Sequence, residues 1–332
     1  MMNLKNKIWI PLFVLGTILL GCDTLIYDEL ADCPQGVYVK FYSMTPCAED
    51  TTFIGNVSSI TVFAFDEDEK LVTTVTKEQV DLRSDYELLL PVADGYFTFI
   101  GWAGVNHHFV RSSFVEGTTT KKDVMFKIQS ENNFFADLTD TRVWQGQSSP
   151  VFLPNPNEFG EVFKQTAINL NEQTNRVKVV VEFDESVTEL TPKDLTIAMA
   201  SANGTINIDG SMPLNSQQLF YPVQHTTYAD RSVAWDFTLL ELVAGYSNRL
   251  TITYPKTGAK VFDGDLIAGI LLNTVAGGVN IACQNDFTVK FLVKDYCASC
   301  GPEHPTDPET YFSCAVYVND WLVHSYDTEL EL

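Results

Sequence analysis

Residues 175–183 read NRVKVVVEF, and this stretch decides the fold class. Apolar side chains recur in it at every second position, at Val177, Val179, Val181 and Phe183. Successive side chains of a β-strand point to opposite faces of its sheet, so the alternation predicts a strand with one buried face. Little of the chain shows apolar residues three and four positions apart, which is the spacing of a helix. The first expectation is therefore an all-β protein.

The same alternation recurs along most of the chain. It is found at residues 37–42, 60–65, 71–76, 86–92, 95–105, 194–210, 232–242, 248–254, 287–295 and 314–332. The turn signals between these stretches are DEDEK at 66–70, ADG at 93–95, Asn203-Gly204 and Asn319-Asp320. Asn-Gly between alternating flanks is a strong hairpin signal, and ADG indicates a second hairpin. Short strands with turns at this spacing predict all-β sandwiches.

The segment PNPNEFGE at 154–161 is rich in Pro, Asn and Gly, which is typical of a boundary between domains. The β pattern starts again after it. About 310 residues remain once the first 21 are set aside, which is enough for two domains with a core each. We expect a signal peptide at 1–21, one β-sandwich domain at 22–160 and a second at 161–332.

A short apolar run opens the chain. Ile8–Leu20 spans 13 residues, follows Lys5 and Lys7, and leads into LLGC at 19–22. A membrane-spanning helix needs about 20 apolar residues, whereas a basic start and a short apolar run are typical of a secretory signal peptide. The LLGC box resembles the bacterial lipobox, whose cysteine receives a diacylglycerol and becomes the first residue after cleavage. We expect Cys22 to carry lipid, because two or more acyl chains give a lasting attachment.

The chain is strongly acidic, with 21 basic and 43 acidic side chains and a net charge of −22. The signal peptide holds two of the lysines and no acidic residue, so the mature chain has a net charge of −24. This charge argues against nucleic acid or an anionic membrane surface as the main partner. The sequence also lacks nucleophile-elbow, zinc-protease, dinucleotide and phosphate-loop motifs. We therefore expect no enzyme activity and no cofactor.

Seven cysteines occur, at positions 22, 33, 47, 283, 297, 300 and 314. With Cys22 carrying lipid, six remain, and an even number in an oxidising compartment favours disulfides. We expect Cys33 to pair with Cys47, and two further bridges to form among Cys283, Cys297, Cys300 and Cys314. The alternative is a zinc site made of Cys297, Cys300, His304 and Cys314, which the CASC spacing permits. Outside the cytoplasm the disulfides are the stronger expectation, so we expect no metal.

Five landmarks stand in a fixed order from the LLGC box onward. They are CDTLIYDELADCPQGVYVKFY from Cys22, ITVFAFDEDEKLV from Ile60, LPVADGYFTFIGWAGV from Leu90, INLNEQTNRVKVVVEF from Ile168 and VNDWLVHSYDTELEL from Val318. In this order they resemble the Bacteroidales fimbrial-anchor lipoproteins, the minor-fimbrium anchor family of type V pili. The resemblance covers essentially the whole mature chain.

The resemblance implies two transthyretin-like β-sandwich domains in tandem, held on the outer membrane by the lipid at Cys22. It also implies that the protein fixes the base of a fimbrium to the cell surface and limits its length, with a shaft subunit (a pilin) as its partner. Type V pilins are understood to polymerise by strand addition, in which an extended segment joins an open sheet through main-chain hydrogen bonds. An anchor that resembles them has to offer one half of such a joint.

The C-terminal segment has the pattern of a strand that could form this joint. Tyr326, Thr328, Leu330 and Leu332 fall on one face, and Asp327, Glu329 and Glu331 fall on the other. One interpretation is the last strand of its own domain, with the acidic side chains facing water. The other interpretation is an edge strand or donor strand for the first shaft subunit.

The alternative function is a surface glycan-binding lipoprotein of a polysaccharide-uptake system. Such a protein would expose two or three tryptophans on one face as a platform for sugars. The candidates are Trp102, Trp144, Trp235 and Trp321, of which Trp102 and Trp235 lie in alternating patterns typical of a core. A third class, a purely structural envelope lipoprotein, would have no partner.

Overall fold

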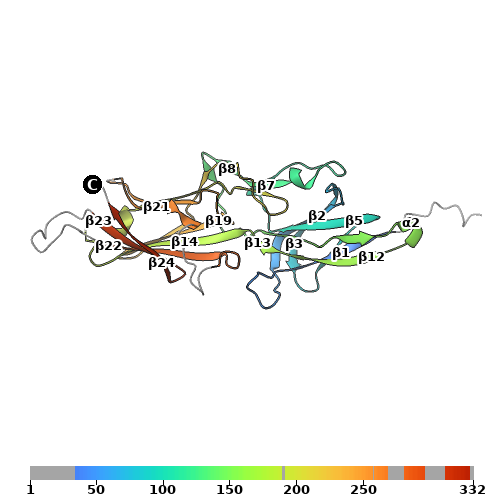
Figure 1. Ribbon diagram of the computed structural model, residues 1–332, viewed down its shortest axis with the longest axis horizontal. Coiled ribbons are helices and arrows are strands. Elements are labelled where there is room, and N and C mark those ends of the chain that lie inside the picture. Colours follow the sequence, from blue (N-terminus) through green and yellow to red (C-terminus); the bar gives the residue numbers. More distant parts are fainter. Residues whose placement is uncertain (1–33, 189–190, 257, 268–279, 296–310, 330–332) are drawn as a thin grey trace, which may run out of the picture.

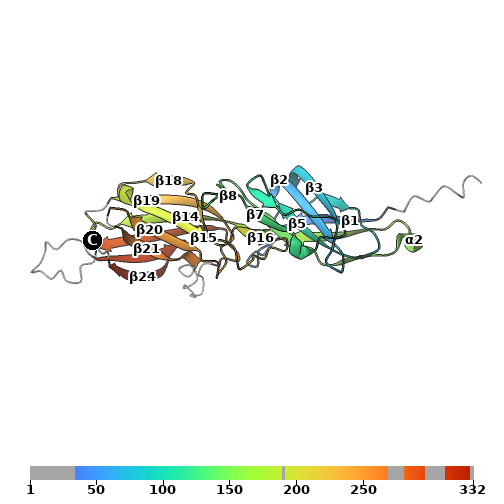
Figure 2. The same ribbon diagram turned by 90° about the horizontal axis from the view of Figure 1, so that it is seen from above.

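The computed structural model describes residues 34–188, 191–256, 258–267, 280–295 and 311–329. They form an elongated molecule built almost entirely of strands, which confirms the all-β expectation (Figure 1). Two β-rich halves lie end to end, and the second view shows the same arrangement (Figure 2). We call the half with β1 and α2 the N-terminal half, and the half with β22, β23 and β24 the C-terminal half.

The strands are β1 (Gly36–Tyr42), β2 (Gly55–Phe65), β3 (Leu71–Leu82), β4 (Glu87–Leu90), β5 (Gly95–Ala103), β6 (Phe109–Arg111), β7 (Met125–Ile128), β8 (Ser130–Glu131), β9 (Phe134–Phe135), β10 (Trp144–Gln147), β11 (Val151–Leu153), β12 (Phe163–Asn169), β13 (Asn171–Glu172), β14 (Thr174–Phe183), β15 (Thr196–Ser201), β16 (Thr205–Asn207), β17 (Leu219–Tyr221), β18 (His225–Tyr228), β19 (Ser232–Leu240), β20 (Arg249–Tyr254), β21 (Ala259–Asp265), β22 (Asp286–Asp295), β23 (Tyr311–Val318) and β24 (Trp321–Glu329). The helical elements of the described residues are η2 (Lys121–Asp123), α2 (Pro156–Phe159) and η3 (Pro192–Asp194).

The N-terminal half contains two packed sheets. One has the strand order β12-β1-β4, and the other has the order β13-β10-β5-β2-β3, with β11 also pairing with β5. Val37 and Val39 of β1 are fully buried, and they belong to one apolar cluster with Val62 of β2 and Phe99 of β5. Burial of this alternating face holds the two sheets together.

The C-terminal half also contains two large sheets. Their strand orders are β18-β19-β14-β22-β23-β24 and β21-β20-β15-β17-β9-β8. The apolar face of β14 predicted from NRVKVVVEF is confirmed, because Val177, Val179, Val181 and Phe183 are between 0% and 3% exposed. Their partners in the core include Trp235 of β19 and Phe291 of β22.

One of the two apolar clusters spans both halves. The largest cluster joins Trp102 of β5, Phe126 of β7 and Phe135 of β9 to Val179 of β14 and Leu219 of β17. Main-chain pairing crosses between the halves of the sequence as well, because β16 pairs with β7 and β17 pairs with β9. The strands β7 to β9 therefore connect the two halves of the molecule.

The proline-rich segment at 154–161 does not separate the sheets of the two halves. It contains α2, which lies at the end of the molecule farthest from β22 to β24 (Figure 1). After it, β12 pairs in parallel with β1, and β13 pairs with β10, so residues 163–172 still belong to sheets of the N-terminal half. We propose that the boundary between the halves lies at residues 172–174, between β13 and β14.

Two of the predicted hairpins are wrong. β15 and β16 flank Asn203-Gly204 but pair with strands of different sheets, because the buried side chain of Asn203 bonds to Leu240 O and a Cβ at position 204 would lie 2.2 Å from the Phe135 ring. Likewise β4 and β5 flank ADG but lie in different sheets. In both cases the turn segment carries the chain from one sheet to another instead of joining two paired strands.

Two other turns are confirmed. DEDEK joins the paired strands β2 and β3, and Glu69 has a positive φ of 62°. Asn319 and Asp320 join β23 to β24 with φ values of 47° and 67°. Asn and Asp tolerate this left-handed backbone better than most residues, which is why they suit a tight hairpin.

Candidate functional site

A disulfide joins the two halves of the molecule. Cys47, which follows β1, is bonded to Cys283, which precedes β22, and their Cα atoms lie 5.8 Å apart. The expected pairing of Cys33 with Cys47 is therefore wrong, and so is the expectation of two bridges among Cys283, Cys297, Cys300 and Cys314. Both expectations paired cysteines close in sequence, whereas the fold brings together two loops 236 positions apart.

The other cysteines stand as follows. Cys314 lies on β23 and is 1% exposed, within the core of the C-terminal half. Cys22, Cys33, Cys297 and Cys300 lie outside the described residues, as does His304. The lipid site and most of the alternative zinc site therefore remain predictions.

The C-terminal strand β24 lies at the edge of its sheet. It pairs with β23 along its length, with Tyr326 opposite Cys314 and Thr328 opposite Phe312. Within the part of the chain that the structure describes, no strand pairs with the other side of β24. Leu330 and Leu332 lie outside that part. The segment is thus the last strand of its own sheet, and it is also an edge.

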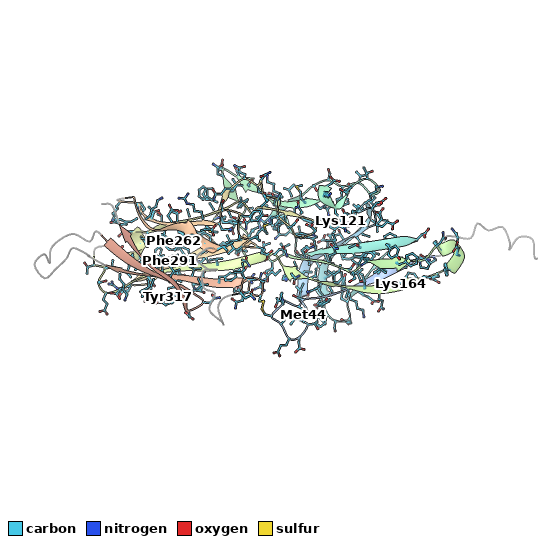
Figure 3. The ribbon with its side chains drawn as sticks, viewed as in Figure 1. Met44, Lys121, Lys164, Phe262, Phe291 and Tyr317 are labelled. Atoms are coloured by element: carbon cyan, nitrogen blue, oxygen red, sulfur yellow. A yellow bond between two sulfur atoms is a disulfide. The ribbon has the colours of Figure 1, made fainter. Side chains whose placement is uncertain are left out.

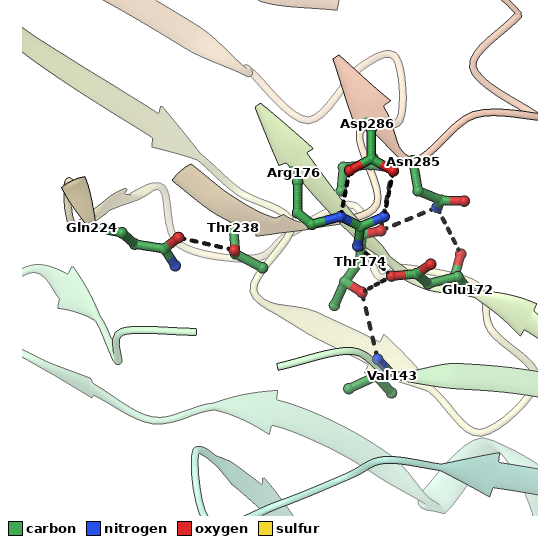
Figure 4. Close-up of polar contacts among 9 residues, drawn as sticks. Val143, Glu172, Thr174, Arg176, Gln224, Thr238, Asn285 and Asp286 are labelled. Atoms are coloured by element: carbon green, nitrogen blue, oxygen red, sulfur yellow. Dashed lines mark hydrogen bonds and ion pairs between the residues drawn. The ribbon is translucent and has the colours of Figure 1, made fainter. Parts of the chain in front are cut away.

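A charged network lies where β13 leads into β14 (Figure 4). The guanidinium of Arg176 donates to both carboxylate oxygens of Asp286, at 2.6 and 2.9 Å, and to Glu172 Oε1 at 2.5 Å. Thr174 Oγ1 also donates to Glu172 Oε1, at 2.8 Å. The side chain of Asn285 donates to the carbonyl oxygens of Glu172 and Thr174, at 3.3 and 3.0 Å. These bonds fix the start of β22 against the link between the halves.

The sequence alone does not predict this network. Arg176 and Asp286 stand at the starts of two apolar strands, in NRVKVVVEF and NDFTVKFLV, and each follows an asparagine. The structure makes them the first register pair of the parallel strands β14 and β22. Parallel strands place their starts side by side, so the opposite charges could have been matched only once this pairing was known.

The charged groups of the network shift one another's pKa. The hydrogen bonds from Arg176 hold the pKa of Asp286 below its usual value, and the hydrogen bond to Asp286 raises the pKa of Arg176. Both groups therefore stay charged at neutral pH. Close by, partial burial raises the pKa of Glu241.

A surface pocket of about 590 Å³ adjoins the network. A loop of the N-terminal half (Thr139–Arg142) and strands β14, β19 and β22 line it, with Lys178 and Asp236 among its charged residues. Thr238 donates to Gln224 Oε1 at 3.0 Å within it. The aromatic residues of its lining, Phe237 and Phe287, are each 2% exposed, so they offer no surface on which a sugar could stack.

The tryptophan platform expected for a glycan-binding protein is not formed by Trp102 and Trp235. Trp102 is 1% exposed and donates to Ile208 O at 2.8 Å, and Trp235 is 4% exposed. Trp144 is only partly exposed on β10. Both strand patterns that favoured a core position are therefore confirmed.

The described residues bring together no cluster of three or more His, Cys, Asp or Glu side chains suited to a metal ion. None of the helices among the described residues is long and apolar enough to span a membrane.

Comparison with known proteins identifies the family. The model of the fimbrillin-A associated anchor proteins Mfa1 and Mfa2 matches residues 30–327. The minor fimbrium anchoring subunit Mfa2 of Porphyromonas gingivalis is 34% identical over 313 residues, covering 94% of this chain and 92% of that protein.

Two solved structures have a similar fold. The fimbrial anchor protein Mfa2 from Porphyromonas gingivalis superimposes with a TM-score of 0.76 at 32% identity, covering 89% of this chain and 100% of that one. A protein of Bacteroides thetaiotaomicron VPI-5482 superimposes with a TM-score of 0.70 at 20% identity, covering 88% and 98%, and shows the fold alone. The chain, with its all-β build and its terminal edge strand, belongs to the family of fimbrillin-A associated anchor proteins Mfa1 and Mfa2.

Proposed function

We propose that this protein is an outer-membrane lipoprotein that anchors a fimbrium through lipid on Cys22, docks the first shaft subunit by β-strand addition and limits the length of the fimbrium. The family supports the anchoring role, because the relative that covers most of the chain is a minor fimbrium anchoring subunit. The finer proposal depends mainly on one observation. The start of the described chain and the open edge of β24 lie in opposite halves of the molecule (Figure 1).

The N-terminal half is the proposed membrane side. Gln35 Nε2 donates to Gly160 O at 2.9 Å, next to α2, and Gly36 N donates to Val162 O at 3.3 Å. These contacts fix the first described residues at the α2 end of the molecule. The proposed lipid site at Cys22 precedes them by about 12 residues, a reach of roughly 40 Å at most. Tension from a lipid on Cys22 would enter the protein at this end.

The C-terminal half is the proposed docking side. A strand at the edge of a sheet presents unpaired main-chain N–H and C=O groups, and an extended segment of a partner can add to it. Each such hydrogen bond contributes only about 1 kcal/mol, so several must act together with apolar burial. β24 spans nine residues, which is long enough for such a ladder.

The pairing of β24 with β23 supports a role as an edge rather than as a donor. Tyr326 and Thr328 already pair with β23, so donating this strand to another subunit would break an existing ladder. Adding a strand of the shaft subunit beside β24 breaks none. We therefore propose that β24 acts as an edge.

The proposed joint between β24 and the first shaft subunit also explains how the length of the fimbrium would be limited. An anchor that occupies the base of the fimbrium leaves no free site there for another subunit. The supply of anchor relative to shaft subunit then sets how long each fimbrium becomes.

Two variants in the native host separate docking from membrane attachment. Deletion of residues 326–332 removes the last four of the nine residues of β24, so the anchor should stay in the membrane while long fimbriae without it appear in the medium. Cys22→Ser removes the lipid site, so fimbriae should be shed together with the anchor. Electron microscopy gives fimbrial length, and immunoblots of cells and medium locate the anchor.

The controls concern folding and partner identity. The purified deletion variant should melt cooperatively, which shows that the remaining sheet is intact. The lipid-free mature chain should capture the fimbrial shaft subunit from envelope extract, identified by mass spectrometry, and the deletion variant should not. Fimbriae of normal length that stay attached to cells carrying the folded deletion variant would overturn the docking proposal.

A further inference from the structure

The disulfide connects two strands into one line along the molecule. β1 lies in the N-terminal half and ends five residues before Cys47, while β22 lies in the C-terminal half and begins three residues after Cys283. Met44, next to this joint, lies near the middle of the long axis, and Phe291 of β22 lies in the C-terminal half (Figure 3). We call residues 36–47 and 283–295, joined by the disulfide, the spliced line.

A second line runs beside it. β12, β13 and β14 follow one another from the α2 end into the C-terminal half and form a continuous stretch of main chain, residues 163–183, which we call the backbone line (Figure 1). β1 pairs in parallel with β12 from Gly36 opposite Phe163 to Tyr42 opposite Asn169. β22 pairs in parallel with β14 from Arg176 opposite Asp286 onward. The two lines therefore run side by side, in the same direction, through both halves.

Side chains hold the two lines together at the joint. On the N-terminal side, Met44 N donates to Asn169 Oδ1 and Asn169 Nδ2 donates to Met44 O, both at 2.9 Å. On the C-terminal side, the amide of Asn285 bonds to the carbonyl oxygens of the backbone line, and Arg176 bonds to Asp286. Leu170 N also donates to Tyr42 O at 2.7 Å. These hydrogen bonds tie the two lines to each other where the halves meet.

Both strands of the spliced line lie inside their sheets. β1 lies between β12 and β4, and β22 lies between β14 and β23. Their inward faces are buried: Val37, Val39 and Phe41 are at most 3% exposed, and Phe287, Val289, Phe291 and Val293 are at most 2% exposed. A force along such a strand loads its hydrogen bonds together rather than one after another.

We propose that the Cys47–Cys283 disulfide carries tension between the membrane and the fimbrium, and that it shields residues 48–282 from that tension. The place where tension enters rests on the proposed function, with the membrane before residue 34 and the shaft at β24. Between those points the chain passes through the spliced line, and residues 48–282 form a covalently closed loop. Pulling can extend only the segments outside this loop.

The length of chain that extends on pulling shows directly how many residues the disulfide protects from the tension. With the disulfide intact, pulling can extend only residues 34–47 and 283–329 of the chain between residues 34 and 329, which is about 60 residues or roughly 200 Å at full extension. Without it, about 300 residues can extend, or roughly 1,000 Å. The expected difference is about fivefold. Reducing the bond removes the limit, because only this covalent link keeps residues 48–282 out of the extended chain.

The experiment is single-molecule force spectroscopy on the lipid-free mature chain, held by enzymatically ligated tags at its two ends. Wild type is compared with the Cys47→Ser/Cys283→Ser double variant, both without reductant, so that any other cysteine pairing is the same in both. A peptide mass map of wild type under non-reducing conditions verifies the bond. If the double variant fails to fold, wild type is reduced after tethering and pulled again.

The short release from oxidised wild type and the roughly fivefold longer release without the disulfide are the expected results. Equal released lengths in the two proteins, or a mass map without the Cys47–Cys283 pair, would overturn the inference. The outcome is independent of the fimbrial test, because the purified chain is pulled by tags at its ends. Loss of fimbrial docking with intact shielding would therefore remove the proposed function and leave this property of the molecule in place.

Discussion

Arg176 and Asp286 form the first register pair of two neighbouring parallel strands, and their side chains meet in a two-pronged ion pair with distances of 2.6 and 2.9 Å. They are 110 positions apart in the sequence. The third guanidinium nitrogen bonds to Glu172, which lies in the link between the halves. One arginine therefore holds together the end of β13, the start of β14 and the start of β22.

Arg176→Ala should destabilise the protein by about 1–2 kcal/mol. The pair with Asp286 is screened, because the Asp286 side chain is 75% exposed, so most of the loss should come from the Glu172 carboxylate, which is 12% exposed and loses a charged donor. The control is Arg249→Ala, which removes a similar two-pronged pair with Asp263 but leaves that carboxylate its contacts with Lys260 and Thr251. Urea unfolding should show a shifted midpoint for Arg176→Ala and almost none for the control. Equal shifts would contradict the role of Arg176 at the link.

Acid should weaken the same ion pair. The hydrogen bonds from Arg176 lower the pKa of Asp286 in the folded protein. A group with a lowered folded pKa contributes stability above its unfolded pKa, about 3.9, and loses this contribution as pH falls through the folded pKa. Wild type should therefore melt at a higher temperature than Asp286→Asn at pH 7, and the two should converge as pH falls below the unfolded pKa and through the lowered folded pKa. Melting curves that stay equally far apart over this range would contradict the assignment.

Loss of the Cys47–Cys283 disulfide should cost about 3–5 kcal/mol. The bond closes a loop with a sequence separation of 236, and closing a long loop reduces the entropy of the unfolded chain. The Cys47→Ser/Cys283→Ser variant should unfold at lower urea concentration than wild type. Reductant should lower the midpoint of wild type strongly and that of the variant much less, and equal effects on both would contradict this pairing.

Gly146→Ala should cost about 3 kcal/mol, because the main chain of the other sheet of the N-terminal half lies very close to this position. A Cβ at this position would lie 1.9 Å from the carbonyl oxygen of Asn169, and main chain cannot move aside without disturbing β12. Gly101, its partner across β5 and β10, is the matched control, since its nearest neighbour would be the end of the Ile168 side chain at 3.3 Å. Thermal melting should separate the two variants clearly. A Gly146→Ala protein as stable as Gly101→Ala would contradict this prediction, because it would show that the two sheets can move apart at Gly146 without a loss of folding stability.

The sequence by itself determined the class of fold and much of its local structure. The alternation in NRVKVVVEF gave the buried face of β14, and the polar turns DEDEK and Asn319-Asp320 gave two hairpins. These features depend on residues within about ten positions of one another. A strand with one buried face needs a period of two, and a tight turn needs residues that accept a positive φ. Both requirements can be read from a short window.

Only the tertiary structure decided which strands pair and which cysteines meet. Asn203-Gly204 has the local form of a hairpin, but burial of Asn203 and the close approach of Phe135 send its two flanks into different sheets. Cys47 pairs with Cys283, and Arg176 with Asp286, because parallel pairing of β1 with β12 and of β22 with β14 brings distant loops to the middle of the molecule. A parallel pair is joined by a long connection rather than by a turn, so no local signal specifies its partner.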